Sequence, residues 1–341
     1  MLTKRKKLMV LMPSYNKDDY IREAIDSVLS QVTDFEFELV VTDDGSTDKT
    51  ISIVNEYIEK HPNKVSLLPS NKNQGLLSNI IKAYEYMDCE YFAVLDADDY
   101  LTDNRFYQKA VDFLEKNPDF NIYASNTHVS HGEDIHEQNT HFKEKFCDST
   151  FEDMLNDKAM LGNTISSVFR NCVIDKNLID KLKEHIGNQY EEAPYREDDF
   201  RNRIHLENSK AHYVNESVGV YRGTETGLYR GSNNLKKHLL KIISFIDMYY
   251  FFDEKYPKFI DLLLPYTRKI NTAVLKGNVN NVLAYNPEDS FEFFNVLSRI
   301  YKINPKLYGN IVAEILSFVR RPKILSFFVK LKQKIKSIFL T

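Results

Sequence analysis

The feature that most limits the fold is an alternation of short apolar runs with amphipathic helical segments through the first third of the 341-residue chain. Continuous apolar runs of this length are typical of strands buried on both faces, and the helical segments between them supply the cover. They predict an α/β fold with a mostly parallel sheet and helices on both faces. The expected strands are residues 7–12, Phe37–Thr42, Lys64–Leu68 and Tyr91–Leu95. The expected helices lie near Asp19–Ser30, Lys49–Glu59, Leu76–Tyr86 and Arg105–Lys116.

A polar, turn-forming cluster follows each of these strands. The clusters are Pro13–Asn16, Asp43–Asp48, Ser70–Gly75 and Asp96–Asp99. Open α/β sheets bind ligands beyond the carboxyl ends of their strands, so the four clusters predict one binding site at that edge. A hydrophobic content of 43%, with 22 Phe and 21 Tyr, supports a packed core. The net charge of −4 argues against a dedicated nucleic-acid binder.

The last cluster concentrates negative charge at the end of an apolar strand, in the stretch "VLDADDYL". A strand places residues i and i+2 on one face, so Asp96 and Asp98 would point together. Two such charges need a cation, and Mg²⁺ or Mn²⁺ prefers carboxylate and phosphate oxygens. The alternative interpretation is that Asp98 and Asp99 begin an ordinary turn. Neither GxGxxG after the first strand nor GxxxxGK[ST] occurs, so a nucleotide would be held by carboxylates and a metal.

The motifs "VLMPSYN", "VVTDDGSTDKT", "NKNQG" and "VLDADDYL", in this order and spacing, resemble the family 2 glycosyltransferases of GT-A fold. The resemblance is close over about residues 1–105 and looser to about residue 234. It implies a GT-A domain over 1–234, with a nucleotide-binding part at about 1–105 and an acceptor part at about 106–234. The segment 235–341 is expected to be helical. The implied activity is transfer of a hexose or N-acetylhexosamine from a nucleotide-sugar, most often a UDP-sugar.

The resemblance also implies roles for individual residues of the four clusters. Pro13, Tyr15 and Asp43 are expected at the nucleobase, Asp96 at the ribose and the metal, and Asp98 at the metal. The remaining expected members of the nucleotide-sugar site are Asn16, Asp44, Asn73, Gly75 and Ala97.

A second acidic stretch, "YREDDFRNRIHL", resembles the motif that carries the general base in inverting members of the family. The resemblance assigns the base of a single displacement to Asp198, with Asp199 as the rival and Glu197 beside them. A positioned carboxylate that takes the acceptor proton contributes on the order of a hundred- to ten-thousand-fold. The competing interpretation is an acidic first turn that favours the helix dipole, and both interpretations can hold together.

Three further segments are interpreted less specifically. In the basic-aromatic loop Val218–Asn234, Arg222, Tyr229 and Arg230 are expected to neutralise the leaving diphosphate. The alternative is an ordinary surface loop.

The stretch "LGNTISSVFRN" resembles the segment near the acceptor, where Ser166, Ser167 or Arg170 would contact that sugar. The alternative is packing of a buried helix. Ile80-Ile81 departs from the Arg-Asn pair that relatives often carry, so contacts made there must come from elsewhere.

The segment from about 319 to 341 interleaves Lys and Arg with large apolar residues, which is typical of helices that lie in a membrane interface. Docking on its own domain or on a second subunit is the alternative. No apolar run of about 18 residues occurs, and three widely spaced cysteines suit a reducing compartment. We therefore expect a cytoplasmic enzyme, peripheral on the inner face of a bacterial membrane.

The expected acceptor is a growing cell-surface polysaccharide or a lipid-linked oligosaccharide, because such substrates suit a membrane-associated transferase. Two other classes stay open at this point: a nucleotidyltransferase on a similar sheet, and a non-catalytic glycan-binding or scaffold protein. The donor sugar, the linkage and the oligomeric state, a homo-oligomer included, cannot be read from the residues. A zinc site at His128, His131, His136 and His141 is a minor alternative to a solvated loop.

Overall fold

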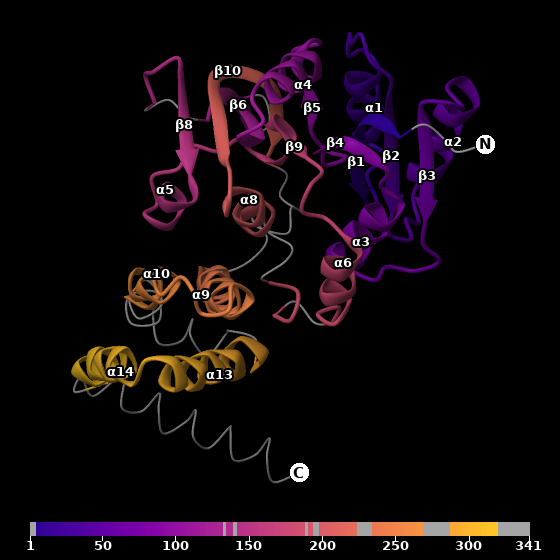
Figure 1. Ribbon diagram of the computed structural model, residues 1–341. Coiled ribbons are helices and arrows are strands. Elements are labelled where there is room, and N and C mark those ends of the chain that lie inside the picture. Colours follow the sequence, from indigo (N-terminus) through magenta and orange to yellow (C-terminus); the bar gives the residue numbers. More distant parts are fainter. Residues whose placement is uncertain are drawn as a thin grey trace. The chain divides into compact units, whose positions relative to one another are not determined.

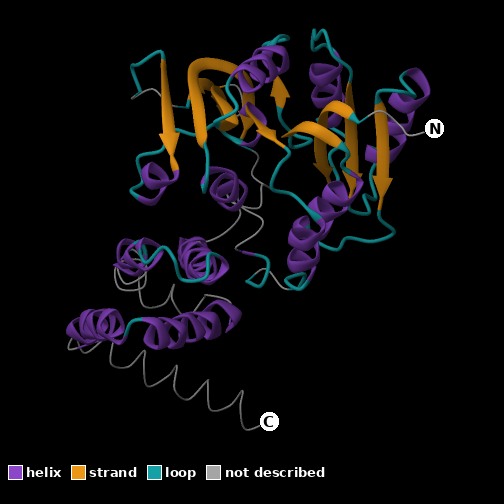
Figure 2. Ribbon diagram, in the orientation of Figure 1, coloured by secondary structure: helices purple, strands orange, loops and turns teal. Residues whose placement is uncertain are grey.

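A computed structural model describes residues 5–131, 134–138, 142–187, 190–193, 198–223, 234–268 and 287–319. The chain divides into two compact units. The first contains residues 1–187 and 195–225, and the second contains residues 188–194 and 226–341. The described part of the first unit is built on a sheet with helices, and the described elements of the second are helices (Figures 1 and 2).

The first half of the sheet has the predicted alternation of strands and helices. Its strands are β1 (Lys6–Ser14), β2 (Phe37–Asp43), β3 (Val65–Pro69) and β4 (Cys89–Val94). The helices between them are α1 (Ile21–Leu29), α2 (Thr50–Lys60) and α3 (Leu76–Tyr86). The strands lie in the order β3-β2-β1-β4, and all neighbours in this group are parallel. The prediction of a parallel α/β sheet is confirmed here.

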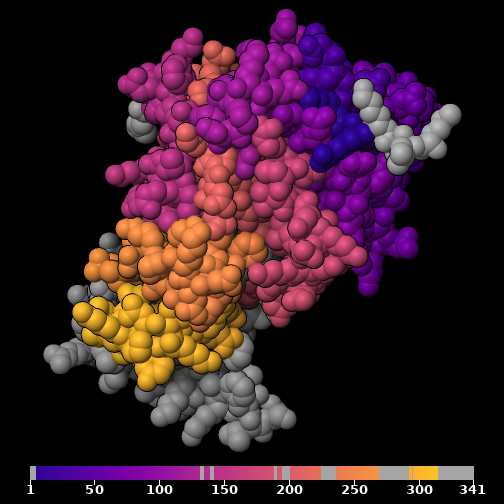
Figure 3. All heavy atoms as spheres, viewed as in Figure 1, coloured from indigo at the N-terminus to yellow at the C-terminus, as the bar shows by residue number. Residues whose placement is uncertain are grey.

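The second half of the sheet mixes directions. The order continues from β4 through β9 (Ser167–Arg170), β6 (Phe120–His131) and β10 (Lys210–Arg222) to β5 (Tyr100–Leu101). Strand β7 (Asp134–Glu137) pairs with β6, and β8 (Phe146–Thr150) pairs with β10. Only the β6–β10 pair among these is parallel in the described chain. In Figure 3 the salmon atoms of β10 accordingly lie among magenta atoms from earlier in the sequence.

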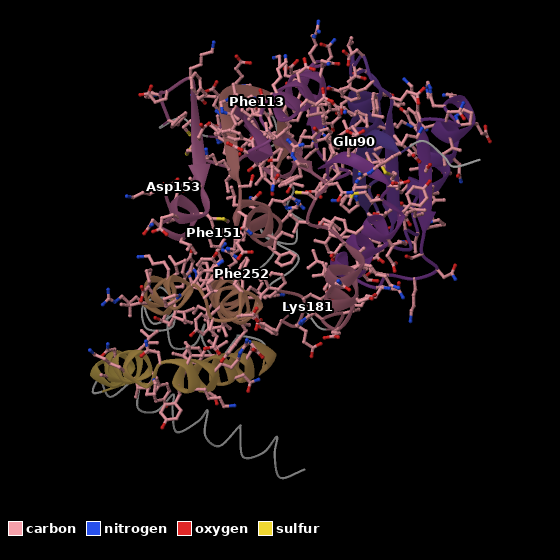
Figure 4. The ribbon with its side chains drawn as sticks, in the orientation of Figure 1. Glu90, Phe113, Phe151, Asp153, Lys181 and Phe252 are labelled. Carbon is pink, nitrogen blue, oxygen red and sulfur yellow. The ribbon has the colours of Figure 1, made fainter. Side chains whose placement is uncertain are left out.

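Short helices complete the described part of the first unit. They are α4 (Phe106–Lys116), α5 (Phe151–Leu155), the 3₁₀ turn η1 (Thr164–Ser166), α6 (Lys176–Lys183) and α8 (Asp198–Leu206). Helix α5 has a capping box, in which the Thr150 side chain accepts from the Asp153 amide and the Asp153 carboxylate accepts from the Thr150 amide. Phe113 of α4 stacks on His212 of β10, with ring centroids 4.1 Å apart (Figure 4). The capping box stabilises the start of α5, and the ring contact packs α4 against β10.

The core explains why the apolar runs form strands. Residues Leu8–Met12 of β1 are consecutive and all are buried, as expected for a central strand covered on both faces. Helix α1 buries Ile21, Ala24, Ile25 and Val28, a spacing that places all four on one face of the helix. Outside this core, Glu90 of β4 accepts a hydrogen bond from Lys7 Nζ at 2.8 Å (Figure 4).

The second unit is described as helices α9 (Asn234–Phe251), α10 (Lys258–Asp261), α13 (Pro287–Ile303) and α14 (Pro305–Val319). Arg299 of α13 forms an ion pair with Asp247 of α9, which joins two helices across the gap in the described residues. No helix in the described ranges is long and apolar enough to cross a bilayer. The basic tail predicted to bind membranes, from residue 320 on, lies outside the described residues.

Candidate active site

The four polar clusters meet at the carboxyl edge of the parallel strands. The register aligns Ser14 of β1 with Asp43 of β2, and Asp43 with Pro69 of β3, so three strands end at one level. On the other side of β1, the Leu95 amide donates to the Leu11 carbonyl at 3.0 Å, just before the acidic cluster. The expectation that the clusters come together at one edge is therefore confirmed.

The first and second clusters are joined by hydrogen bonds through Asn16. Its backbone has a φ of 51°, in the left-handed region that Asn tolerates better than most residues. The Asn16 amide donates to Ser46 Oγ at 2.8 Å, and the Thr47 amide donates to Asn16 Oδ1 at 2.9 Å. The Lys17 amide donates to Thr50 Oγ1 at 2.8 Å. Tyr15 beside them is exposed, at 42% of its surface.

Asp43 closes its own turn. Its Oδ1 accepts from the amides of Gly45 and Ser46 at 3.0 and 2.8 Å, and its Oδ2 accepts from Ser46 Oγ at 2.5 Å. The side chain is completely buried. Its expected contact with a nucleobase stays a prediction, and any such contact must be made by a carboxylate that already accepts three hydrogen bonds.

Asp44 links the second cluster to the third. Its two oxygens accept from the amides of Gln74 and Gly75, both at 2.9 Å. Burial raises the pKa of Asp44, while these two amides oppose that rise. Asn73 is exposed, and its Oδ1 accepts from the Gly75 amide at 3.1 Å. Asp44 therefore holds the backbone that follows the exposed Asn73, and the expected contacts of both residues with the nucleotide-sugar stay predictions.

Helix α3 carries the Ile80-Ile81 departure from the Arg-Asn pair, and a lysine follows it. Ile81 is buried in the core, whereas the next residue, Lys82, extends toward the strand ends. Lys82 Nζ donates to the carbonyls of Asp43 and Leu68 at 3.1 and 3.0 Å and to Ser70 Oγ at 2.6 Å. Burial lowers the pKa of Lys82. Sequence reasoning missed this lysine, and its place immediately after the departing pair was the available signal.

The acidic cluster does not present all its carboxylates alike. Asp96 and Asp98 are half-buried, while Ala97 and Asp99 are 1% exposed. The Asp99 amide donates to the Asp96 carbonyl at 2.9 Å, so the segment turns back on itself. Asp98 Oδ2 lies 2.5 Å from Lys17 Nζ. Strand β4 ends at Val94 and the hydrogen bond from the Asp99 amide makes Asp96–Asp99 a turn, so the strand spacing that would point Asp96 and Asp98 together does not apply here, and the predicted turn begins at Asp96 and not at Asp98.

Asp99 and Arg222 tie the acidic cluster to the end of β10. The Arg222 amide donates to Asp99 Oδ1 at 2.7 Å, and Arg222 Nη1 donates to the Asp98 carbonyl at 2.7 Å. The same guanidinium pairs with Glu23 of α1 and lies 4.4 Å from the ring centroid of Tyr100. Burial raises the pKa of Asp99 well above its usual range. The expected role of Arg222 toward a diphosphate stays a prediction. The terminal nitrogens of Arg222 already bind the Asp98 carbonyl and Glu23, so a diphosphate would have to compete with these partners.

The candidate bases stand at the start of a helix. Helix α8 begins at Asp198 and continues through Asp199, as the acidic-first-turn interpretation predicts. Their side chains lie outside what the structure describes, as do Glu197, Tyr229 and Arg230. Which of Asp198 and Asp199 is the base stays open.

The expected acceptor segment is a 3₁₀ turn followed by strand β9, so the interpretation as a buried helix is wrong. Residues Ser167–Arg170 instead pair with β4 and β6, which leaves their backbone in the sheet. Ser166 is fully buried and its Oγ donates to the Ser125 carbonyl at 2.8 Å. Arg170 Nη1 donates to Tyr91 Oη at 3.2 Å, and Nη2 donates to the Leu114 carbonyl at 2.5 Å, near the end of α4. These side chains serve the fold in the arrangement observed.

The four histidines of the alternative zinc site lie on or after strand β6 in the sequence. His128 of β6 and His136 of β7 lie on paired strands, opposite Glu137 and Val129 respectively. His141 lies outside the described residues. In the parts of the chain that the structure describes, no group of three or more His, Cys, Asp or Glu side chains could hold a metal ion. Asp96 and Asp98 are the two half-buried carboxylates of the acidic segment, and an ion held by them would take further ligands from a bound substrate or from water.

Comparison with known proteins gives a family match and a set of similar folds. The family model described as "Glycosyl transferase family 2" matches residues 9–182. The minor teichoic acid biosynthesis protein GgaB of Bacillus subtilis is 33% identical over 116 residues, which are 34% of this chain and 13% of GgaB. The chain spans about a third of the length of the first curated relatives that it matches.

Two solved structures have a similar fold. TarS residues 1–349 of S. aureus, in complex with UDP-GlcNAc, superposes with a TM-score of 0.62 at 17% identity and covers 95% of this chain and 92% of that chain. The mannosyltransferase PcManGT from Pyrobaculum calidifontis, in complex with GDP-Man and Mn²⁺, has a TM-score of 0.50 at 16% identity, with coverage of 93% and 88%. At these identities the likeness establishes the fold, which is the predicted GT-A type.

Proposed function

The chain belongs to glycosyl transferase family 2 and is a glycosyltransferase, and we propose that it moves a sugar from a UDP-sugar to a hydroxyl of a cell-surface polysaccharide or lipid-linked oligosaccharide. The observation that carries this proposal is the convergence of four polar clusters at one sheet edge, inside the matched residues. The family match favours this proposal over a nucleotidyltransferase, and the presence of Asp96, Asp98 and Asp198 supports it over a non-catalytic relative. The domain division at residue 234 and the peripheral membrane location remain parts of the proposal.

One comparison supports the choice of donor, and another supports the choice of acceptor. TarS is bound to UDP-GlcNAc, and its fold aligns over nearly the whole of both chains. GgaB, a teichoic acid biosynthesis protein, supports a cell-surface polymer as the acceptor class. In the proposed site the exposed ring of Tyr15, two residues after the buried Pro13, offers a flat surface for the uracil base. Asn73 lies at the same edge through its hydrogen bond to the Asp44-bound loop.

A divalent ion fits the acidic cluster by its donor chemistry. Asp96 and Asp98 are half-buried carboxylates at the end of β4, and hard ions such as Mn²⁺ or Mg²⁺ take one or two carboxylates plus substrate phosphates. PcManGT, which carries Mn²⁺, has a similar fold. When bound, the ion would offset negative charge on the diphosphate as the bond between the sugar and the diphosphate breaks. The buried Asp99 would hold the segment in place through its bond from the Arg222 amide.

The proposed chemistry is a single displacement with inversion. The acceptor oxygen forms a bond to the anomeric carbon while the bond from that carbon to the phosphate oxygen breaks, and UDP leaves. The acceptor proton passes to a carboxylate, which we assign to Asp198, with Asp199 as the rival. Both residues stand in the first turn of α8, where the positive end of the helix dipole favours the ionised form that a base needs.

Ligand binding by the full chain is the first test. Melting temperatures would be measured with UDP, GDP and CMP, each with and without Mn²⁺. A ligand that binds only the native state stabilises it, by about 2.7 kcal/mol at a hundred times its dissociation constant. We expect Mn²⁺-dependent stabilisation by UDP. A nucleotide-sugar panel with mass spectrometry of the products then identifies the donor.

A pair of Asp→Asn variants, one on each side of strand β4 in the sequence, supplies the control. Asp98→Asn should abolish the Mn²⁺-dependent part of the shift. Asp88→Asn, at the opposite end of β4 with a 70% exposed side chain, should leave it unchanged. Stabilisation by none of the three nucleotides in either condition would contradict the proposed function.

A further inference from the structure

Lys17 is the cation that faces the proposed metal ligand. Its Nζ lies 2.5 Å from Asp98 Oδ2, and the two side chains are 21% and 15% exposed. The backbone of Lys17 is fixed from both sides: its amide donates to Thr50 Oγ1 at 2.8 Å, and its carbonyl accepts from the amides of Tyr20 and Ile21 at 3.0 and 2.9 Å. The backbone of Lys17 is therefore held in place, and its flexible side chain extends to Asp98.

The other cations at this edge are held differently. Arg222 donates to the Asp98 carbonyl and pairs with Glu23, and Lys82 donates to backbone carbonyls and Ser70. Lys17 instead neutralises the Asp98 carboxylate itself. A lysine ammonium is a compact charge on a rotatable stem, so it can change partners without a backbone movement.

We propose that Lys17 is a displaceable counter-ion, which gives up Asp98 to the divalent ion and then pairs with the diphosphate of the donor. This inference rests on the proposed function. Two cations cannot both lie against Asp98 Oδ2 without strong repulsion, so the ion has to replace the ammonium. The released charge then lies at the sheet edge where the donor's phosphates are expected.

This exchange makes metal and nucleotide binding cooperative. The ion alone must break the contact between Lys17 and Asp98, which weakens its binding. When a nucleoside diphosphate is present, the displaced ammonium gains phosphate oxygens, so the cost of displacement is offset. Coupling between two ligands is reciprocal, and UDP should strengthen Mn²⁺ binding by the same factor by which Mn²⁺ strengthens UDP binding.

The test measures Mn²⁺ binding directly, by electron paramagnetic resonance of free Mn²⁺ and by calorimetry, on the full chain with and without UDP. Lys17→Met removes the charge and keeps most of the apolar stem. The variant should bind Mn²⁺ alone on the order of tenfold more tightly, since a charge-assisted contact of this kind contributes about that factor. With saturating Mn²⁺ it should bind UDP on the order of tenfold more weakly, because the ammonium that pairs with the diphosphate is lost, whereas UDP binding in EDTA should change little. The factor by which UDP strengthens Mn²⁺ binding should therefore shrink.

Two further variants separate this exchange from other effects. Lys49→Met makes the same charge change at an exposed position before α2 and should leave both affinities unchanged. Lys17→Arg keeps the charge and should retain most of the coupling, which also guards against a folding defect in Lys17→Met. Equal effects in Lys49→Met and Lys17→Met would mean a bulk charge effect and would overturn the inference.

The failures of the inference and of the proposed function are distinguishable. If Lys17→Met binds Mn²⁺ alone no more tightly than the wild type, while the wild type binds UDP with Mn²⁺, Lys17 is only a structural link and the function stands. If the wild type transfers sugar but binds no Mn²⁺ with or without UDP, both the exchange and the metal site are wrong. If it neither binds nucleotides nor transfers sugar, the proposed function fails as well.

Discussion

Gly45 offers the sharpest test of how the second and third clusters are held together. It has a φ of +77°, in the left-handed region where a side chain is strained. A Cβ added there would lie 2.6 Å from the carbonyl carbon of Lys72 and 2.9 Å from the Asn73 nitrogen. Both are backbone atoms, so the clash cannot be relieved by rotating a side chain. Gly45→Ala must push the third cluster away from the second.

The expected loss of stability combines two costs. A left-handed backbone costs an alanine roughly 1–2 kcal/mol, and overpacking against fixed atoms costs typically about 1–3 kcal/mol. Gly45→Ala should therefore destabilise the first unit by about 2–5 kcal/mol. For a unit of about 200 residues, each kcal/mol lowers the melting temperature by roughly 2–4 °C, so a drop of about 5–15 °C is expected.

Thermal unfolding followed by circular dichroism measures this loss, and UDP affinity measures its effect on the site. Gly309→Ala in α14 is the control: an added Cβ there would have no atom within 4 Å, and alanine favours a helix by about 1 kcal/mol over glycine. Gly45→Asn tolerates the left-handed backbone better than Ala and so isolates the clash. A melting temperature for Gly45→Ala within about 1 °C of the wild type would refute the close approach of the two clusters.

Three further predictions concern pH, catalysis and membranes. Burial lowers the pKa of His205 to about 4, so the unfolded chain takes up a proton below about pH 6.5 while the folded chain does not until about pH 4. The folded state should then lose on the order of 2 kcal/mol between pH 7 and pH 5, and His205→Phe should flatten the pH dependence of the melting temperature; an unchanged slope would assign it to other groups. Asp198→Asn should lower kcat by roughly 10²–10⁴ with little change in UDP binding, whereas a larger loss in Asp199→Asn would move the base to that residue. Deleting residues 320–341 should release the protein from anionic lipid vesicles and leave donor hydrolysis intact, since each basic residue near such a surface contributes about 1 kcal/mol; sedimentation of the truncated protein with vesicles would locate the membrane contact elsewhere.

The first half of the sheet could be predicted because its signal is local. Each strand there is a continuous apolar run, and the structure places the predicted Phe37–Thr42 within β2, which covers Phe37–Asp43. The stretch Ser167–Arg170 was harder, because four residues show no period that separates a short strand from a buried helix. Its place between β4 and β6 depends on pairing with strands far away in the sequence, which composition cannot reveal.

Within the candidate site, the location of the acids could be predicted but their partners could not. The sequence places Asp43 and Asp44 side by side in one turn, yet one closes that turn and the other holds a different loop. The difference follows from strand register and from the direction of each side chain. Lys17 gave no signal at all, because its partner is 81 positions away. Adjacency in sequence reports which loop a residue belongs to, whereas its partner is determined by the sheet.

Hydrogen bonds and one ion pair connect all four polar clusters to one another. Asn16 joins the first and second clusters, Asp44 joins the second and third, and Lys17 joins the first and the acidic cluster. Arg222 then joins the acidic cluster to β10. The Asn16 and Asp44 links involve backbone amides and the close approach at Gly45, so they set the spacing of the loops. The link through Lys17 is made by two side chains alone, so it can open while the other loops keep their positions. The proposed exchange of Lys17 for a divalent ion at Asp98 requires such a link.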